Sequence, residues 1–320
     1  MNLEKPLNTI STLKIENEDD FLSPKNFPHF PKNWTLYSES MLSFDGTKKL
    51  NSFILESKHQ RTKKILFVVH GLGEHGSRYF HFPHYLDQSI DLIVILELQG
   101  HGRSEGQRGH VDHFDDFNKD LLMWVELWKS RCKEFFDGAK IILFGHSMGG
   151  LIVLRQLLGK QNLDFCCAIV SAPALGAKVE VPKIKKILAK NLVSIIGRVP
   201  LASGISSKYL SHDAAVVQLY DQDPFVYKKV TPKLFVSILK AMDEVNESTE
   251  ELTVPTLFLS PMTDLIVDAE KTITFYQKQK KMESKHQIRK YPEFYHESFN
   301  EVGKEKIFED INQWISSNCN

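Results

Sequence analysis

One stretch, residues 140–154, constrains the fold of this chain more than any other. It is an apolar run that ends in Gly-x-Ser-x-Gly and passes at once into a helix-like run. This order is typical of a strand, a sharp turn that carries a serine, and a helix. We expect a strained backbone at Ser147, where side chains at positions 145 and 149 would collide, and glycines occupy both positions. The Ser147 hydroxyl is then predicted to project from the strand tip, at the positive end of the next helix.

The bulk composition favours one large α/β domain with an insertion. A chain of 320 residues can bury about three quarters of its unfolded surface, so it needs no disulfides to be stable. Lysine plus arginine and aspartate plus glutamate both number 40, and this zero formal charge argues against nucleic acid as a main partner. Two of the four cysteines, Cys166 and Cys167, are adjacent in a predicted buried strand, so we expect no secreted-type disulfide framework.

The N-terminus and the hydropathy pattern predict where the protein works. The first residues have no basic segment followed by an apolar one, so we expect no signal peptide. No apolar run reaches the ~18 residues that cross a bilayer. These features predict a cytoplasmic protein, with peripheral membrane association as a further option.

Strands and helices alternate along most of the chain. Strands are expected at residues 64–69, 91–98, 140–145, 165–170, 256–260 and 287–291. Helices are expected at residues 82–88, 115–131, 269–279 and 304–316. Apolar and polar residues alternate along residues 35–55, with Asp45-Gly46 in the middle, and this pattern predicts a β-hairpin. This order predicts a mostly parallel sheet with helices on both faces.

The alternation divides the chain into four segments. Residues 1–34 are polar and proline-punctuated, and we interpret them as an extension. Residues 35–173 and 253–320 are the two parts of the α/β core. Residues 174–252 interrupt the alternation and are predicted to form a helical cap inserted into that core.

A serine hydroxyl is a poor nucleophile at neutral pH and needs a base that is itself oriented by an acid. In an open α/β sheet the reactive groups gather outside the carboxyl ends of the strands. Asp264 and His296 each follow a predicted strand there, and the chain order Ser147, Asp264, His296 is the one expected for this architecture. Asp268 is the competing acid, although it can also cap the next helix. We predict that His296 is the base, that Asp264 orients it, and that activity rises with pH through roughly 6–7.

The reaction also needs two backbone N–H groups that stabilise the negative oxygen of the intermediate. One is predicted to be the amide of Met148, directly after the serine. The other is predicted to be the amide of Leu72, in the His-Gly-Leu-Gly loop after the strand at residues 64–69.

Three motifs resemble those of the monoacylglycerol lipase and lysophospholipase group of α/β-hydrolases, the S33 serine aminopeptidase-like hydrolases. The resemblance extends from about residue 35 to the C-terminus and includes the surroundings of Asp264 and His296. Glu97 departs from it, since that group more often has Asp before its Gly-His-Gly turn. The motifs are His70–Tyr79 (HGLGEHGSRY), Gly100–Gly106 (GHGRSEG) and Gly145–Gly150 (GHSMGG).

The resemblance implies an enzyme whose serine is acylated by an ester of a single-chain lipid, with water then releasing the fatty acid. It implies no metal and no organic cofactor. In such enzymes the cap covers an apolar channel above the serine. Here the Ile184–Ile196 stretch repeats apolar residues at i, i+3, i+4 with lysines largely opposite, which predicts a basic amphipathic helix. That helix either docks on the core or touches a membrane.

Four other functions stay open at this point. A small-ester esterase, a peptidase and an acyltransferase can all use the same acyl-enzyme. A carrier of hydrophobic ligands without catalysis belongs to a different class, and the intact serine, histidine and aspartate argue against it. Dependence of the rate on acyl-chain length, and labelling of Ser147 by an organophosphorus fluoride, distinguish these possibilities.

Overall fold

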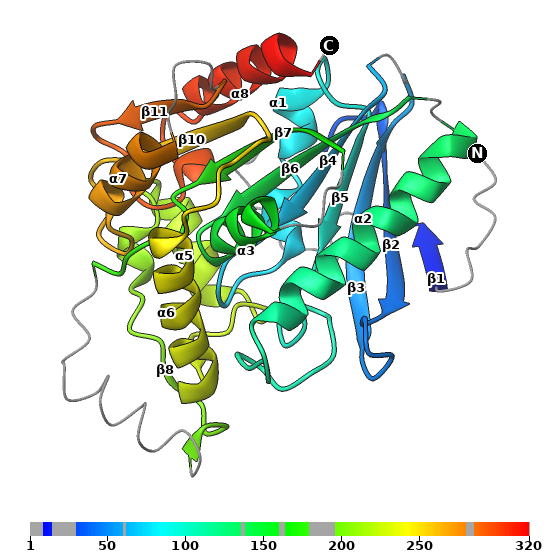
Figure 1. Cartoon of the computed structure of the whole chain (residues 1–320). Helices are drawn as coiled ribbons and strands as arrows, with labels where there is room; N and C mark the ends of the chain where they lie inside the picture. The colour runs from blue at the N-terminus through cyan, green and yellow to red at the C-terminus, as the bar shows by residue number, and fades with distance from the viewer. Residues whose placement is uncertain are drawn as a thin grey trace.

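The computed structural model describes residues 9–14, 30–59, 62–135, 138–159, 164–178, 196–279 and 285–319. Within these residues a nine-stranded sheet has the order β1-β2-β3-β5-β4-β6-β7-β10-β11 (Figure 1). All neighbours from β5 to β11 are parallel, whereas β1, β2, β3 and β5 pair antiparallel. The strands are β1 (Thr9–Lys14), β2 (Trp34–Leu42), β3 (Lys49–Ser57), β4 (Lys64–Val69), β5 (Leu92–Leu96), β6 (Lys140–His146), β7 (Phe165–Ser171), β10 (Thr256–Pro261) and β11 (Gln287–Tyr291).

Helices cover both faces of this sheet and enclose two apolar clusters. One face is covered by α2 (Asp115–Phe135), α3 (Met148–Leu158), α6 (Pro232–Glu247) and α7 (Ala269–Gln279). The other face is covered by α1 (Phe82–Leu86) and α8 (Glu305–Asn318). The predicted mostly parallel sheet with helices on both faces is therefore confirmed. Among the described helices, none combines the length and the apolar character that crossing a bilayer demands.

The N-terminal half of the sheet contains one predicted feature and one that was not predicted. The hairpin is confirmed, because β2 and β3 pair from Trp34↔Ser57 to Leu42↔Lys49 around a turn at Asp45 and Gly46. In contrast, residues 1–34 were interpreted as an extension in which no strand was predicted, and β1 lies within them and pairs antiparallel with β2. The extension therefore adds an edge strand to the core sheet.

The inserted region is helical in the part that the structure describes, with a short ribbon added. It contains η3 (Ser207–Tyr209), α5 (Ala214–Gln222) and a two-stranded ribbon of β8 (Leu201–Ala202) and β9 (Lys229–Val230). The Asp213 side chain caps α5, and the Thr231 side chain caps α6, which packs on α3. The predicted amphipathic helix Ile184–Ile196 lies outside the described residues except for its last one.

A disulfide bond links the C-terminal end of the chain to β7. A disulfide joins Cys166 to Cys319 with 5.5 Å between their Cα atoms, and the buried Cys167 sulfur lies 2.8 Å from that of Cys319. The register of β7 against β6 shifts at Cys166, which is a β-bulge. One such bond is no secreted-type framework, but the sequence pattern did not predict it.

Candidate active site

The turn between β6 and α3 has the strained geometry that the sequence predicts. Ser147 has φ 52° and ψ −116°, a conformation that L-residues rarely adopt. A Cβ atom at Gly145 would lie 2.5 Å from the Gly149 carbonyl oxygen, and one at Gly149 would lie 2.0 Å from the Val69 carbonyl oxygen. The prediction that these glycines prevent collisions is therefore confirmed.

The predicted base and acid meet in a hydrogen bond. His296 Nδ1 lies 2.7 Å from Asp264 Oδ2, and both side chains are buried. The other oxygen of Asp264 accepts the backbone N–H groups of Ile266 and Val267, at 2.7 and 3.0 Å. The competing Asp268 instead accepts the N–H of Glu270 at the start of α7. With Nδ1 bound to Asp264, the Nε2 atom of His296 is the one left to face a substrate or serine.

The electrostatic environment favours a charged aspartate beside a basic histidine. Burial would raise the pKa of Asp264, but the charge and hydrogen bond of His296 outweigh burial and lower this pKa. Burial would likewise lower the pKa of His296, and the negative charge of Asp264 raises it instead. His146, whose ring lies 4.7 Å from that of His296, has its pKa lowered to about 3, chiefly by burial, and is uncharged at neutral pH.

The loop from His70 to Gly76, which we call the oxyanion loop, follows β4 and passes directly beside the serine. A Cβ atom at Gly71 would lie 3.2 Å from the Ser147 Cβ atom, so glycine allows this close approach. The loop closes around the Glu74 carboxylate, which accepts the Gly71 N–H and, at 2.9 Å, the Tyr79 hydroxyl. Of the two predicted amides, Leu72 lines the cavity at the serine. Met148 is the first residue of α3, where helix N–H groups have no partner within the helix.

Ser147, His296 and Leu72 share one small cavity of about 20 Å³. The inserted region forms part of its wall, through Ile205, Leu210 and Tyr220, and Ser147 itself is half-buried. The backbone N–H of Glu297 donates to the Leu210 carbonyl at 2.8 Å, which ties the inserted region to the loop of His296.

A buried cluster of charges that the sequence reasoning did not single out forms one side of this cavity. Glu74 and Glu297 both line it, and Arg78 bonds to both carboxylates. The Arg78 guanidinium also lies 5.0 Å from the centre of the Tyr220 ring. A signal was present, since Glu74 and Arg78 belong to the HGLGEHGSRY motif and Glu297 follows His296, but no residue pattern indicated that they meet.

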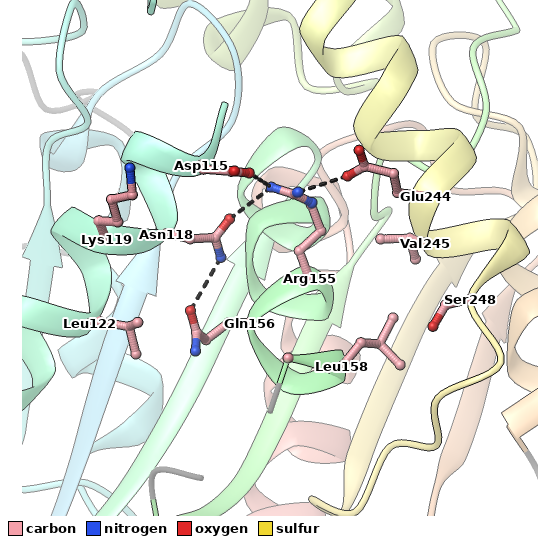
Figure 2. A pocket seen from close by; sticks show the side chains of 11 residues that line it. Asp115, Asn118, Lys119, Leu122, Arg155, Gln156, Leu158, Glu244, Val245 and Ser248 are labelled. Carbon is pink, nitrogen blue, oxygen red and sulfur yellow. Dashed lines mark hydrogen bonds and ion pairs between the residues drawn. The ribbon is translucent and has the colours of Figure 1, made fainter. Parts of the chain in front are cut away.

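A larger cavity of about 320 Å³ lies elsewhere, between α2, α3 and α6 (Figure 2). At its centre Arg155 bonds to Asp115 at 2.8 Å and to Glu244 at 2.7 Å. These charges satisfy one another, and neither Ser147 nor His296 lines the cavity. We therefore assign it no part in the chemistry. Across the described ranges, no three His, Cys, Asp or Glu side chains are grouped as a metal ion would require.

A serine on a strained turn, a histidine–carboxylate pair and a glycine-rich loop meet at the carboxyl edge of a doubly covered sheet. Together they define a serine hydrolase with the α/β-hydrolase fold. The sequence model of the family described as "Serine aminopeptidase, S33" matches residues 60–303, and the chain belongs to this family.

Similar proteins cover most of the chain. Human monoglyceride lipase is 29% identical over 258 residues, which are 79% of this chain and 82% of that protein. Phospholipase YtpA of Bacillus subtilis (strain 168) is 27% identical over 252 residues, 78% of this chain and 94% of its own. The crystal structure of Paleococcus ferrophilus monoacylglycerol lipase has a TM-score of 0.69 and 29% identity, and the match covers 79% of this chain and 94% of that one.

Proposed function

We propose that this enzyme hydrolyses carboxylic esters of single-chain lipids, with Ser147 as nucleophile, His296 as base and Asp264 as the residue that orients His296. The observation that carries the proposal is the shared cavity of Ser147, His296 and Leu72, backed by the 2.7 Å bond from His296 to Asp264. The lipid substrate is supported by the similar proteins, which are two monoacylglycerol lipases and a phospholipase.

In the first half of the reaction the Ser147 oxygen attacks the ester carbonyl carbon, and His296 Nε2 takes the serine proton. The carbonyl oxygen becomes negative and is stabilised by the N–H groups of Leu72 and Met148. The carbon–oxygen bond to the alcohol then breaks, and His296 returns its proton to the departing alcohol. This leaves the fatty acyl group on Ser147.

In the second half a water molecule replaces the alcohol. His296 takes a proton from that water, the resulting hydroxide attacks the acyl carbon, and the same two amides stabilise the oxygen. Ser147 then leaves with the proton that His296 holds, and the fatty acid is released. Asp264 stays ionised throughout and stabilises the positive charge that His296 carries in both halves.

The charges beside the serine favour a neutral alcohol over a phosphate. Glu74 and Glu297 provide two carboxylates against the single guanidinium of Arg78, so this side of the cavity has a net negative charge. Glycerol hydroxyls donate hydrogen bonds to carboxylate oxygens, whereas an anionic headgroup is repelled. We therefore favour monoacylglycerols over lysophospholipids.

Substrate entry requires part of the cap to move. Pockets that bind small ligands measure about 300–1,000 Å³, and the cavity at Ser147 is about 20 Å³. Displacement of the covering Ile205, Leu210 and Tyr220 side chains would open it. We propose that the basic stretch Ile184–Ile196 makes the peripheral membrane contact from which a lipid enters.

A cytoplasmic location is also part of the proposal and has its own test. The cytosol keeps thiols reduced, so Cys166 and Cys319 should react with an alkylating reagent when cells are lysed directly into denaturant, which exposes the buried Cys319. A blocked pair under those conditions would argue for an oxidising compartment instead.

A hydrolysis panel tests the substrate assignment. Monoacylglycerols of short, medium and long chain are compared with lysophosphatidic acid and an aminoacyl amide, with Ser147→Ala as the inactive control. We expect medium and long monoacylglycerols to react fastest. Preference for the shortest ester indicates a small-ester esterase, and cleavage of the amide alone indicates a peptidase; either result contradicts the proposal.

The headgroup preference has a matched pair of variants. Glu297→Gln should raise the rate on lysophosphatidic acid relative to monoacylglycerol by about tenfold, because it removes one charge from the cavity. Glu293→Gln, an exposed residue on the same loop, should leave this ratio unchanged. An equal ratio in the two variants would contradict the electrostatic argument.

A further inference from the structure

A second group of serine, histidine and aspartate lies on the far side of the oxyanion loop. His75 Nε2 lies 2.8 Å from Asp223 Oδ2, and the Ser77 hydroxyl lies 2.8 Å from His75 Nδ1. These three residues, which we call the His75 network, are 8%, 1% and 9% exposed in the order Ser77, His75, Asp223. Such burial excludes a substrate, so the network needs another explanation.

The network joins two regions that are 148 residues apart in sequence. His75 belongs to the oxyanion loop, whereas Asp223 ends α5 in the inserted region. With the Ser77 hydroxyl donating to Nδ1, the Nε2–H of His75 donates to the Asp223 carboxylate. The second oxygen of Asp223 accepts the N–H of Phe225 at 2.8 Å, so the carboxylate is held from both sides.

Further contacts hold the same two segments together. The Tyr227 N–H donates to the Gly73 carbonyl at 2.8 Å, and a Cβ atom at Gly73 would lie 2.5 Å from the Tyr227 carbonyl oxygen. The centre of the Phe225 ring also lies 5.7 Å from that of the His75 ring. The inserted region therefore contacts the oxyanion loop on both sides of Glu74.

A buried glutamate fixes the other end of the loop to the core. Glu97 accepts the N–H groups of Gly76 at 3.1 Å and Arg103 at 2.8 Å, and the side-chain amide of Asn51 at 2.9 Å. Gly76, at the end of the loop, is thus fixed by the core. Residues 73 and 75, on either side of Glu74, are instead bonded to the inserted region, and Leu72 is adjacent to the first of them.

We propose that Asp223 and His75 are positioning residues that orient the Leu72 amide through the cap, so that the oxyanion site is complete when the cap is seated. The inference rests on the proposed function, since Leu72 matters only if an oxyanion forms at Ser147. Opening of the cap at Asp223 releases the oxyanion loop, and closing restores it. Catalytic power is therefore coupled to cap closure over the substrate.

The test compares turnover with the binding of a ketone that mimics the tetrahedral intermediate. Asp223→Ala should lower kcat by about 10- to 100-fold, below the 10²–10³ that loss of a whole oxyanion donor costs, with KM changed less than about threefold. The inhibition constant of a long-chain trifluoromethyl ketone should rise by the same factor as kcat falls. A merely structural role would change stability without this parallel change.

Two conservative variants and a control complete the test. Asp223→Asn keeps an acceptor oxygen and His75→Gln keeps a donor, so each should recover most of kcat even where Asp223→Ala fails to fold. Asp221→Ala removes a half-exposed carboxylate on the same turn, paired with Lys228, and should behave as the parent enzyme. A parent-like kcat in Asp223→Ala, or a loss confined to KM, would overturn the inference. If Ser147→Ala retains activity, the proposed function fails independently of Asp223.

Discussion

The molecule contains two groups of serine, histidine and aspartate, which have the same residue types but different surroundings. Ser147 lies on a strained turn and lines a cavity with His296, whereas Ser77 lies in the short helix η2 (Gly76–Tyr79), buried under the cap. The histidine rings are also oriented oppositely. His296 binds its carboxylate through Nδ1, and His75 binds its carboxylate through Nε2.

Access to a substrate, rather than the identity of the three residues, separates the reactive group from the structural one in this molecule. Both carboxylates have a lowered pKa, because burial is outweighed by the neighbouring histidine and by backbone N–H groups. Both are therefore charged at neutral pH and hold their histidines firmly. Only the group at Ser147 adds a cavity and nearby amides where a new charge can form, which is what catalysis requires.

The sharpest contrast is between the two serines. Ser147→Ala should lower kcat by at least about 10⁴-fold, because it removes the nucleophile. Ser77→Ala removes one hydrogen bond to His75 and should lower kcat less than about tenfold. Hydrolysis of a long-chain monoacylglycerol measures both, and a larger loss in Ser77→Ala would reverse the assignment.

The two aspartates near β10 give the next largest contrast. Asp264→Asn should lower kcat by about 10³–10⁴-fold, because an amide stabilises the wrong tautomer of His296 and cannot balance its positive charge. Asp268→Asn weakens a cap on α7 and should keep kcat within about twofold. The measurement is kcat for purified variants of equal thermal stability. Equal losses of kcat in the two variants would contradict the assignment of Asp264 as the residue that orients His296.

The pH dependence follows from the raised pKa of His296. Below that pKa the ring is protonated and cannot accept the serine proton, so kcat/KM should fall about tenfold per pH unit. The inflection should lie above the ordinary value of 6.5, since Asp264 favours the charged ring. Asp264→Ala should move any residual inflection downward. A profile that is flat between pH 5 and 8 in the parent enzyme, a range of about three units around the ordinary histidine pKa, is the contrary result.

The smallest effect concerns the contact between cap and oxyanion loop. Gly73 and Gly46 have nearly equal φ angles, 75° and 72°, but a Cβ atom at Gly46 meets nothing within 4 Å. Gly46→Ala should cost about 1–2 kcal/mol of unfolding free energy from backbone strain alone. Gly73→Ala should cost about 1–3 kcal/mol more, through collision with Tyr227, and should also lower kcat severalfold. Urea unfolding measures the loss of unfolding free energy, and initial rates measure kcat. An equal loss of unfolding free energy in the two variants would mean that the cap shifts away from residue 73 without cost.

Much of the fold was predictable because its signals are local. The strand at Lys64–Val69 was predicted with its observed bounds, and the hairpin followed from alternation around Asp45-Gly46. The edge strand β1 was not predictable in the same way, since Thr9–Lys14 is a short, largely polar segment that forms a strand by pairing with β2. The Cys166–Cys319 bond likewise depends on a bulge and on the position of the C-terminus, which no spacing reveals.

The candidate site likewise contains residues whose proximity was predictable and a contact that was not. Ser147, Asp264 and His296 follow strands, and strand ends converge at one edge of a parallel sheet, so their proximity could be predicted. The contact of His75 with Asp223 joins the core to an insertion, whose placement no sheet rule governs. Its residues were visible in sequence motifs, but their partnership was not.

Covalent labelling determines whether Ser147 is the nucleophile. The protein is treated with a long-chain alkyl fluorophosphonate, and the modified peptide is identified by mass spectrometry in the parent enzyme and in Ser147→Ala. We predict one adduct, on Ser147, that disappears in the variant while Ser77 stays unmodified. An adduct on Ser77, or none on Ser147 in an enzyme that still hydrolyses esters, would contradict the assignment.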